Sequence, residues 1–350
     1  MISFECDYNN GAHPKVLEKL LENNSKQSRT YGLDEWTESA KQKIRTACGI
    51  QDASVWFLVG GTQTNATVID SILHTYEGVV AVDSAHINTH EAGAIEFTEH
   101  KVITIPGHDG KMIAADLDSF MDDFMHDVSY SRDTSFSHSV FPGMVYITFP
   151  TELGTIYSAR ELDDIYSICR KYGVPLYIDG ARLGYGLMCD QCDMDMQYIA
   201  SHCDAFYIGG TKVGALCGEA VVFTHNNVHP HFFSIVKQHG ALVAKGRLIG
   251  TQFDALFTDN LYFDISRHAI DMAMKMKQIF IEKGWKFFVD SPTNQQFVIV
   301  SNDEVERLSK EVEFTHWSRL GPDHTVCRFV TSWSTTDDDI ELLRKIINNQ

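Results

Sequence analysis

Two short apolar segments that end abruptly in polar residues constrain the fold of this chain more than any other feature. The first, at residues 176–179, continues into Gly-Ala-Arg, and the second, at residues 205–210, continues into Thr-Lys. Each has the length and the aliphatic and aromatic composition of a buried strand. In open α/β sheets, ligands bind beyond the carboxyl ends of the strands. We therefore expect Asp179, Arg182 and Lys212 to share one site at the edge of a sheet.

An acidic side chain and a lysine at the end of a sheet suit pyridoxal phosphate (PLP) chemistry. Lys212 would hold the aldehyde of the cofactor as a Schiff base, and Asp179 would keep its pyridine nitrogen protonated, so that the ring can accept electrons. Taken singly, Asp179 is better explained as a helix cap and Lys212 as an ordinary surface lysine. The hypothesis of a PLP site therefore depends on other segments of the chain as well as on this pair.

Strand-like and helical segments alternate through the first 259 residues. Strands are predicted at residues 55–59, 79–83, 101–105, 144–149, 175–179, 205–209 and 219–223, of which the last could run antiparallel. Helices are predicted at residues 14–23, 36–48, 117–126 and 159–172, and a serine-rich loop at residues 130–138. This alternation predicts an α/β fold with a mostly parallel, seven-stranded sheet between two layers of helices.

The pattern changes after residue 259. A long helix at residues 263–283 is followed by short strands near residues 297–300, 314 and 326 and by helices at residues 304–310 and 338–347. We therefore expect three regions: an N-terminal arm and helix (1–30), a large PLP-binding domain (31–259) and a small α+β C-terminal domain (260–350).

Composition argues against several classes of partner. The 350 residues carry 47 acidic and 29 basic side chains, and the net charge of −18 argues against binding to nucleic acid or to an anionic membrane. No apolar run approaches the roughly 20 residues of a membrane helix, and no secretory signal is recognisable. The eight cysteines are therefore expected to be reduced thiols in the cytoplasm. Cys189 and Cys192 lack a second pair at convincing spacing, so no metal site is expected.

A candidate phosphate site follows the strand at residues 55–59. The run Gly60-Gly61-Thr62-Gln63-Thr64-Asn65 opens a helix, whose first N–H groups can donate to an anion that glycine allows to approach closely. The run lacks the lysine and spacing of a nucleotide-binding P-loop. The alternative is a turn in which Thr62 caps the helix.

His86 follows the strand at residues 79–83. Its imidazole could stack on a cofactor ring and accept a proton from a substrate hydroxyl, and Glu91 could orient it. By itself, a histidine after a strand is more often a structural loop residue.

In their order and spacing these segments resemble the threonine aldolases of the β-eliminating lyase family, within the fold-type I (aspartate aminotransferase) group of PLP enzymes. The likeness runs nearly end to end. It is carried by Asp7 with residues 11–14, and by residues 31–34, 60–65, 85–86, 91–94, 150–155, 179–182, 209–212, 245–247 and 328–331.

The resemblance implies a role for each matching residue of the cofactor site. Lys212 would bind PLP covalently, Asp179 would pair with its pyridinium, His86 would stack on its ring, and Gly61 and Thr62 would hold its phosphate. Arg182 would contact both cofactor and substrate.

The resemblance also implies how substrate is bound. Arg182 and Arg328 would grip the substrate carboxylate, for which a guanidinium is well shaped. Tyr31 and Arg247 would complete the cofactor and substrate site of a neighbouring subunit in a dimer or dimer of dimers (a homotetramer), and His138 falls where the family often has a second histidine near the substrate hydroxyl.

Two positions depart from the family pattern. Cys6 replaces a serine that helps to bind the substrate carboxylate, so we expect a weaker contact there. The segment 150–152, Pro-Thr-Glu, replaces Asn-Thr-His of many members, which bears on substrate preference rather than on cofactor chemistry.

The activity implied by the resemblance is aldol cleavage of L-threonine, L-allo-threonine or a related β-hydroxy-α-amino acid to glycine and an aldehyde. The alternatives are a PLP-dependent β-eliminating lyase or aminotransferase on the same scaffold, and a non-catalytic relative. Retention of Lys212, Asp179 and His86 argues against the last.

Overall fold

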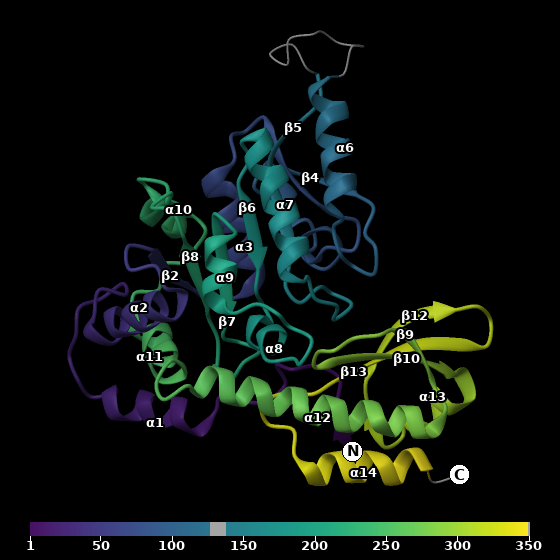
Figure 1. Cartoon of the computed structure of the whole chain (residues 1–350). Coiled ribbons are helices and arrows are strands. Elements are labelled where there is room, and N and C mark those ends of the chain that lie inside the picture. Colours follow the sequence, from purple (N-terminus) through teal and green to yellow (C-terminus); the bar gives the residue numbers. More distant parts are fainter. Residues whose placement is uncertain (127–137, 349–350) are drawn as a thin grey trace.

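The computed structural model describes residues 1–126 and 138–348 (Figure 1). A seven-stranded sheet in the order β2-β8-β7-β6-β5-β3-β4 lies at its centre. The strands are β2 (Ser54–Leu58), β3 (Glu77–Val82), β4 (Lys101–Ile105), β5 (Phe141–Thr148), β6 (Leu176–Asp179), β7 (Ala205–Gly209) and β8 (Glu219–Phe223). Strands β4, β3, β5, β6 and β7 pair in parallel, whereas β8 runs antiparallel to both β7 and β2.

Helices cover both faces of this sheet. α6 (Ala114–Met125), α7 (Ala159–Tyr172) and α9 (Met196–Ser201) lie on one face and α3 (Gly61–Ile72) on the other (Figure 1). Every residue of β6, β7 and β8 is consequently buried, which explains why these strands read as continuous apolar runs rather than as alternating ones. Helix α7 is well delimited, because Ser158 and Glu161 form a capping box and Gly173 ends the helix at a φ of 69°.

Further helices fill the connections and one flank. These are α1 (Pro14–Asn23), α2 (Glu35–Cys48), α4 (His86–Thr89), α5 (Ala94–Phe97), α8 (Leu183–Leu187), α10 (Phe232–Gln238) and α11 (Arg247–Leu256). The sequence pattern does not predict α11. Its eight residues from Ile249 to Leu256 are all buried, so it lacks the exposed polar stripe of an amphipathic helix, and Gly246 provides no side-chain cap.

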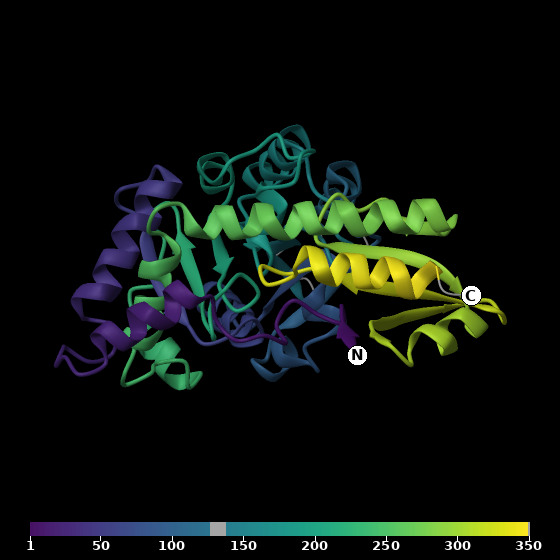
Figure 2. The ribbon, with the colours of Figure 1, turned by 90° about the horizontal axis from the view of Figure 1, so that it is seen from below.

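A second, four-stranded antiparallel sheet, β12-β13-β10-β9, forms the C-terminal part with three helices. Its elements are α12 (Leu261–Lys283), β9 (Lys286–Val289), β10 (Gln295–Ser301), α13 (Asn302–Leu308), β12 (Thr315–Leu320), β13 (His324–Val330) and α14 (Asp337–Asn348). Figure 2 shows α12 running from the flank of the central sheet to the C-terminal sheet. The division into regions 1–30, 31–259 and 260–350 stays a proposal.

The N-terminal arm crosses to this C-terminal part. β1 (Ile2–Ser3) pairs in parallel with β11 (Val312–Glu313), and Phe4 packs in the same core as α12 and α14. Asp7, three residues after Phe4, therefore lies between the two sheets. Of the loop predicted at residues 130–138, only His138 lies within the described residues.

Candidate active site

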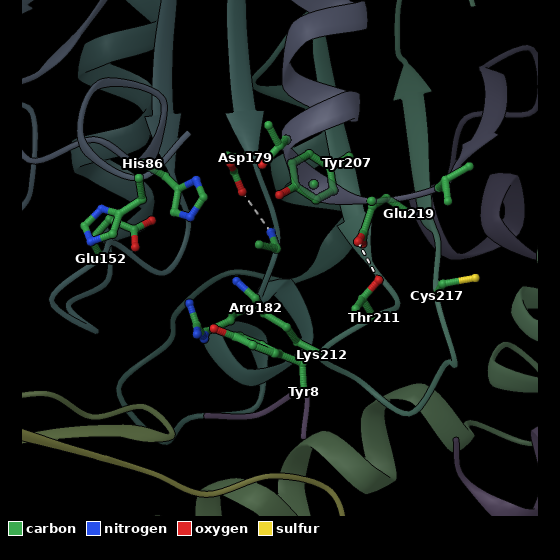
Figure 3. A pocket seen from close by; sticks show the side chains of 16 residues that line it. Tyr8, His86, Glu152, Asp179, Arg182, Tyr207, Thr211, Lys212, Cys217 and Glu219 are labelled. Carbon is green, nitrogen blue, oxygen red and sulfur yellow. Dashed lines mark hydrogen bonds between the residues drawn. The ribbon is translucent and has the colours of Figure 1, made fainter. Parts of the chain in front are cut away.

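A cavity of about 300 Å³ lies at the carboxyl ends of the parallel strands (Figure 3). Because β3, β5, β6 and β7 run in the same direction, the segments that follow them meet at one edge of the sheet. The cavity brings together six of the side chains or glycines chosen from the sequence: Gly61, Thr62, His86, Asp179, Arg182 and Lys212.

Lys212 lies in the connection between the antiparallel strands β7 and β8. This connection is tight, since a Cβ on Gly210 would come within 2.6 Å of the Gly218 carbonyl oxygen. Tyr185 Oη donates to the Lys212 carbonyl oxygen over 2.6 Å and so fixes the backbone there. Within the described part of the chain, Lys212 Nζ makes no hydrogen bond or ion pair; it lies 5.9 Å from the centre of the Tyr8 ring.

Burial of the amine and the nearby Arg182 guanidinium lower the pKa of Lys212, although Asp7 and Glu152 oppose them. A lower pKa increases the neutral fraction of an amine, and the neutral amine is the nucleophile. The position and the electrostatics of Lys212 thus suit covalent capture of an aldehyde.

Asp179 ends β6 and is held by three donors. Tyr146 Oη lies 2.6 Å and Asn65 Nδ2 2.9 Å from its Oδ2, and the Ala181 N–H donates to its Oδ1 over 3.0 Å. Asn65 also donates to Glu91 Oε1 over 2.8 Å, and its own oxygen accepts from Tyr177 Oη over 3.0 Å. The carboxylate of Asp179 is therefore fixed in orientation at the cavity wall (Figure 3).

His86 forms a dyad with the buried Glu91, because its Nδ1 lies 2.7 Å from Glu91 Oε1. An Nδ1–H that donates to this carboxylate leaves Nε2 as an acceptor. Burial lowers the pKa of His86, but the hydrogen bond that it donates to Glu91 and the carboxylates of Glu152 and Asp179 outweigh this effect, so the pKa lies above its ordinary value. His86 can thus accept a proton at Nε2 while Glu91 stabilises the charge.

The opposite end of the cavity is the start of α3. Thr64 is the first residue of α3 whose backbone N–H donates within the helix, to the Gly60 carbonyl oxygen over 2.9 Å. The N–H groups of Gly61 and Thr62 are thereby left for a ligand. A Cβ on Gly61 would come within 3.2 Å of Tyr207 Oη, so glycine keeps this approach open.

Arg182 is already paired in this structure. Its Nε lies 2.7 Å from Asp7 Oδ2 and its Nη2 lies 3.0 Å from Asp7 Oδ1, and both side chains are buried. Burial raises the pKa of Asp7, but the Arg182 guanidinium and the Lys212 amine outweigh it and hold that pKa below its ordinary value. Arg182 therefore cannot offer its Nε–Nη2 edge to a substrate, and only its Nη1 side remains for that role.

Arg328 lies outside the cavity lining, at the end of a row of rings. His86 and His90 stack with their centres 5.5 Å apart, His90 and Trp317 at 5.7 Å, and the Arg328 guanidinium lies 5.2 Å from the Trp317 ring. Among the described residues its buried Nε has no hydrogen-bond partner. Cys6 is half-buried and does not line the cavity either. The structure thus brings neither residue into direct contact with the space next to Lys212.

Tyr31 and Arg247 lie on the flank of α2, away from the cavity of their own chain. Tyr31 is 39% exposed and lines a separate groove with Trp56 and Phe233. Arg247 donates to the Lys26 and Asn24 carbonyl oxygens over 2.5 and 3.1 Å. Their role in a neighbouring subunit stays a prediction.

His138 does not line the cavity of its own chain, so its expected place near the substrate hydroxyl stays a prediction. It is exposed and precedes β5 by three residues, so it lies at the amino end of a strand whose carboxyl end faces the cavity. The eight residues of β5 span about 26 Å at roughly 3.3 Å per residue. The histidine that adjoins His86 in this chain is His90.

Several cavity residues have no predicted role from the sequence, among them Tyr8, His90, Glu152 and Glu219. Glu219 did carry a signal, because it is the one charged residue in the apolar strand at 219–223. Glu152 was noted only as a departure from the family pattern. Across residues 1–126 and 138–348, no three His, Cys, Asp or Glu side chains are grouped to hold a metal ion.

Comparison with known proteins relates the whole chain to one family. The family model described as "Beta-eliminating lyase" matches residues 11–295. A threonine aldolase structure from Leishmania major is 36% identical, covers 99% of this chain and 100% of its own, and superimposes with a TM-score of 0.93. A low specificity L-threonine aldolase of Pseudomonas aeruginosa is 27% identical over 349 residues, which are 98% of this chain and 95% of that protein.

More distant structures share the fold alone. Serine palmitoyltransferase from Sphingomonas wittichii is 12% identical and covers 99% of this chain and 86% of its own, with a TM-score of 0.72. The α/β, fold-type I architecture expected from the sequence is therefore confirmed. Since the family model spans most of the chain and the Leishmania protein is 36% identical along nearly its full length, this chain belongs to the beta-eliminating lyase family, whose members depend on PLP.

Proposed function

We propose that this protein is a PLP-dependent lyase that cleaves L-threonine, L-allo-threonine or a related β-hydroxy-α-amino acid to glycine and an aldehyde. The observation that carries the proposal is one cavity in which the fixed carboxylate of Asp179 and the His86–Glu91 dyad meet the amine of Lys212, which has no ion-pair partner among the described residues. The relatives of this chain are named threonine aldolases, which supports this reaction over others of the family.

The residues present fit PLP. The donor groups at the start of α3 suit its phosphate, Gly61 leaves room for a close approach, and Asp179 is an acceptor for a protonated ring nitrogen. Lys212 would hold the aldehyde and His86 would lie against the ring. When bound, PLP would supply the electron sink that makes a bond at Cα breakable.

The protein's own groups would orient the substrate and move its protons. The Nη1 side of Arg182 would hold the substrate carboxylate, and the predicted contact of Arg328 with the same carboxylate would need a movement toward the cavity, because Arg328 lies outside its lining. His86 Nε2 would accept the proton of the β-hydroxyl, and Glu91 would stabilise the imidazolium that results. The carbonyl product then forms as the Cα–Cβ bond breaks.

The β-eliminating lyase and the aminotransferase are the competing reactions. Both would use Lys212 and Asp179, but neither needs a base at a β-hydroxyl, and the dyad of His86 and Glu91 provides one. Incubation of the purified protein with PLP and L-threonine should release glycine and acetaldehyde in equal amounts. Formation of 2-oxobutanoate and ammonia without glycine would decide for elimination.

Further parts of the proposal concern assembly and location. We expect a homodimer or dimer of dimers in which Tyr31 and Arg247 complete the neighbour's site, and both residues lie near the surface of the flank, which supports this. We also expect the cytoplasm, where the eight free cysteines would stay reduced. In the described ranges, no helix has the length and apolar character needed to cross a membrane.

A further inference from the structure

A buried carboxyl group lies where the cavity should bind an anion. Glu219 is the first residue of β8 and is only 4% exposed. In the sheet it stands opposite Leu58 on one side and Gly209 on the other. Leu58 leads directly to Gly60 and Gly61 at the start of α3, and Gly209 leads to the Lys212 connection. Its side chain therefore lies between the candidate phosphate site and the lysine.

In the ionised form this carboxylate accepts two hydrogen bonds. Its Oε2 accepts from the Gly210 N–H over 2.9 Å, and its Oε1 accepts from Thr211 Oγ over 2.7 Å (Figure 3). Thr211 Oγ accepts in turn from the Gly218 N–H over 3.1 Å. The Thr211 hydroxyl has one hydrogen, and while it donates this hydrogen to Glu219 it cannot donate to a ligand.

A phosphate monoester carries a charge of roughly −1.5 to −2 near pH 7. An ionised Glu219 beside it would repel it at short range, and more strongly than in water because the carboxylate is buried. A protonated Glu219 removes this repulsion. It can also donate to Thr211 Oγ, which frees the threonine hydrogen for a phosphate oxygen.

Several ionisable groups face Glu219. Burial raises the pKa of Glu219 to about 7, although Thr211, Gly210 and Lys212 oppose this, and Asp179 adds to it. The other titratable groups around it come from the neighbouring strands, the end of the connection and α12, and are Tyr177, Tyr207, Cys217 and Tyr262. Half of the molecules would thus hold the proton near neutral pH.

We propose that Glu219 and Thr211 form a proton-controlled gate for the cofactor's phosphate, which binds when Glu219 is protonated and is repelled when it is ionised. This inference rests on the proposed use of PLP. It adds a specific requirement: the phosphate contributes less to affinity as the pH rises.

The test compares PLP with pyridoxal, which has the same aldehyde and ring but no phosphate. Dissociation constants of both are measured on the cofactor-free protein, by absorbance and intrinsic fluorescence, from pH 6 to 8.5. Both ligands react with Lys212, so the titration of the amine affects both dissociation constants equally. The ratio of the two constants therefore reports the contribution of the phosphate to affinity. If only the protonated form accepts phosphate, PLP binding weakens relative to pyridoxal by roughly 30-fold at pH 8.5, given a pKa of about 7.

Glu219→Gln keeps the size of the side chain but removes its titration. In this variant we expect PLP binding relative to pyridoxal to stay constant as the pH rises. At pH 8.5 the variant should bind PLP more tightly than the wild type does. Glu152→Gln, at the histidine end of the same cavity, is the matched control and should keep the wild-type decline. Retained pyridoxal binding shows that each variant is folded.

The gate is overturned if Glu219→Gln shows the same pH dependence as the wild type, or if it binds PLP more weakly than the wild type at every pH. The second result would mean that the carboxylate anchors the site. A wild type that binds PLP with the expected decline but does not cleave threonine would refute the proposed reaction and leave the gate standing.

Discussion

At the scale of single residues, the surroundings of Lys212 suit it to act as a nucleophile and those of His86 suit it to act as a base. Burial and a neighbouring guanidinium favour the neutral amine of Lys212, whereas the Glu91 carboxylate favours a charged His86. Both groups lie near one acid, Glu152, which acts on both through its charge. The chemistry thus depends on which partner each group has, and three predictions follow from single substitutions.

Lys212→Ala should abolish covalent attachment of PLP and the visible absorbance that accompanies it. The reason is that, among the described residues, Lys212 is the lysine that lines the cavity. Reduction of the wild-type complex with borohydride, followed by peptide mass spectrometry, should place the cofactor on the peptide that contains Lys212. Label on Lys237 or Lys245 instead would refute the assignment.

His86→Asn should lower kcat/KM for L-threonine by about 10²- to 10⁴-fold, as expected for loss of a general base. His324→Asn is the matched control, since His324 is exposed on β13 and remote from the cavity lining, and it should behave as the wild type. An effect of only a few-fold at His86 would leave it a role in shaping the pocket alone.

Glu91→Gln should move the acidic limb of the kcat/KM profile to lower pH. A base must be neutral to act, so activity is lost as the pH falls through the pKa of His86. The hydrogen bond to Glu91 raises that pKa above its ordinary value, and glutamine removes the charge that does so. A profile that keeps its wild-type limb would show that His86 is not the titrating base.

At the scale of elements, the N-terminal arm connects the two sheets through Asp7. The arm pairs with β11, Asp7 is bound to Arg182 after β6, and Asn294 Nδ2 donates to Asp7 Oδ2 over 2.9 Å. Removal of one member of a buried ion pair leaves the other charge unpaired. The arm therefore belongs to the active site as much as to the C-terminal part.

Asp7→Asn should destabilise the protein by about 3–5 kcal/mol at pH 7. Because the pKa of Asp7 is held below its ordinary value, this contribution is present above the pKa of the unfolded state, about 3.9, and is lost as the pH falls through the folded value. Denaturant unfolding should therefore show a constant gap between variant and wild type from pH 8 to 5 that narrows below about pH 4. Glu5→Ala, at an exposed side chain of the same arm, should have little effect.

At the scale of the whole molecule, the flank of α2 and α11 presents apolar side chains to solvent. Leu33 and Phe233 are 53% and 45% exposed and line one groove with Tyr31, and Leu248 in α11 is 40% exposed. Such a surface suits contact with a second copy of the chain. The expected assembly would bury it and bring Tyr31 to a neighbour's cavity.

Light scattering at the assay concentration should therefore find at least a dimer. A double substitution of exposed apolar residues, Leu33→Glu with Leu248→Glu, should dissociate it and reduce activity together with PLP affinity. An active monomer would refute the shared site.

The sequence by itself determined the seven strands of the central sheet, the longer amphipathic helices and the residues at the strand ends. Continuous apolar runs, glycines and capping residues act over a few positions, so β6, β7 and β8 and the placement of Asp179 and Lys212 could be predicted. Local sequence also indicated His86 and the run at residues 60–65 as a candidate phosphate site, and the family pattern supported both.

Only the tertiary structure decided which side chains meet across the sheet. The partner of Arg182 is Asp7, 175 positions away, and nothing local indicates that pairing. His138 is close in sequence to a strand of the cavity but lies at its other end. Glu219 lies between the strand that leads to α3 and the strand that leads to Lys212, because β8 runs antiparallel between β2 and β7. Strand order and direction arise from long-range packing rather than from the residues of one segment.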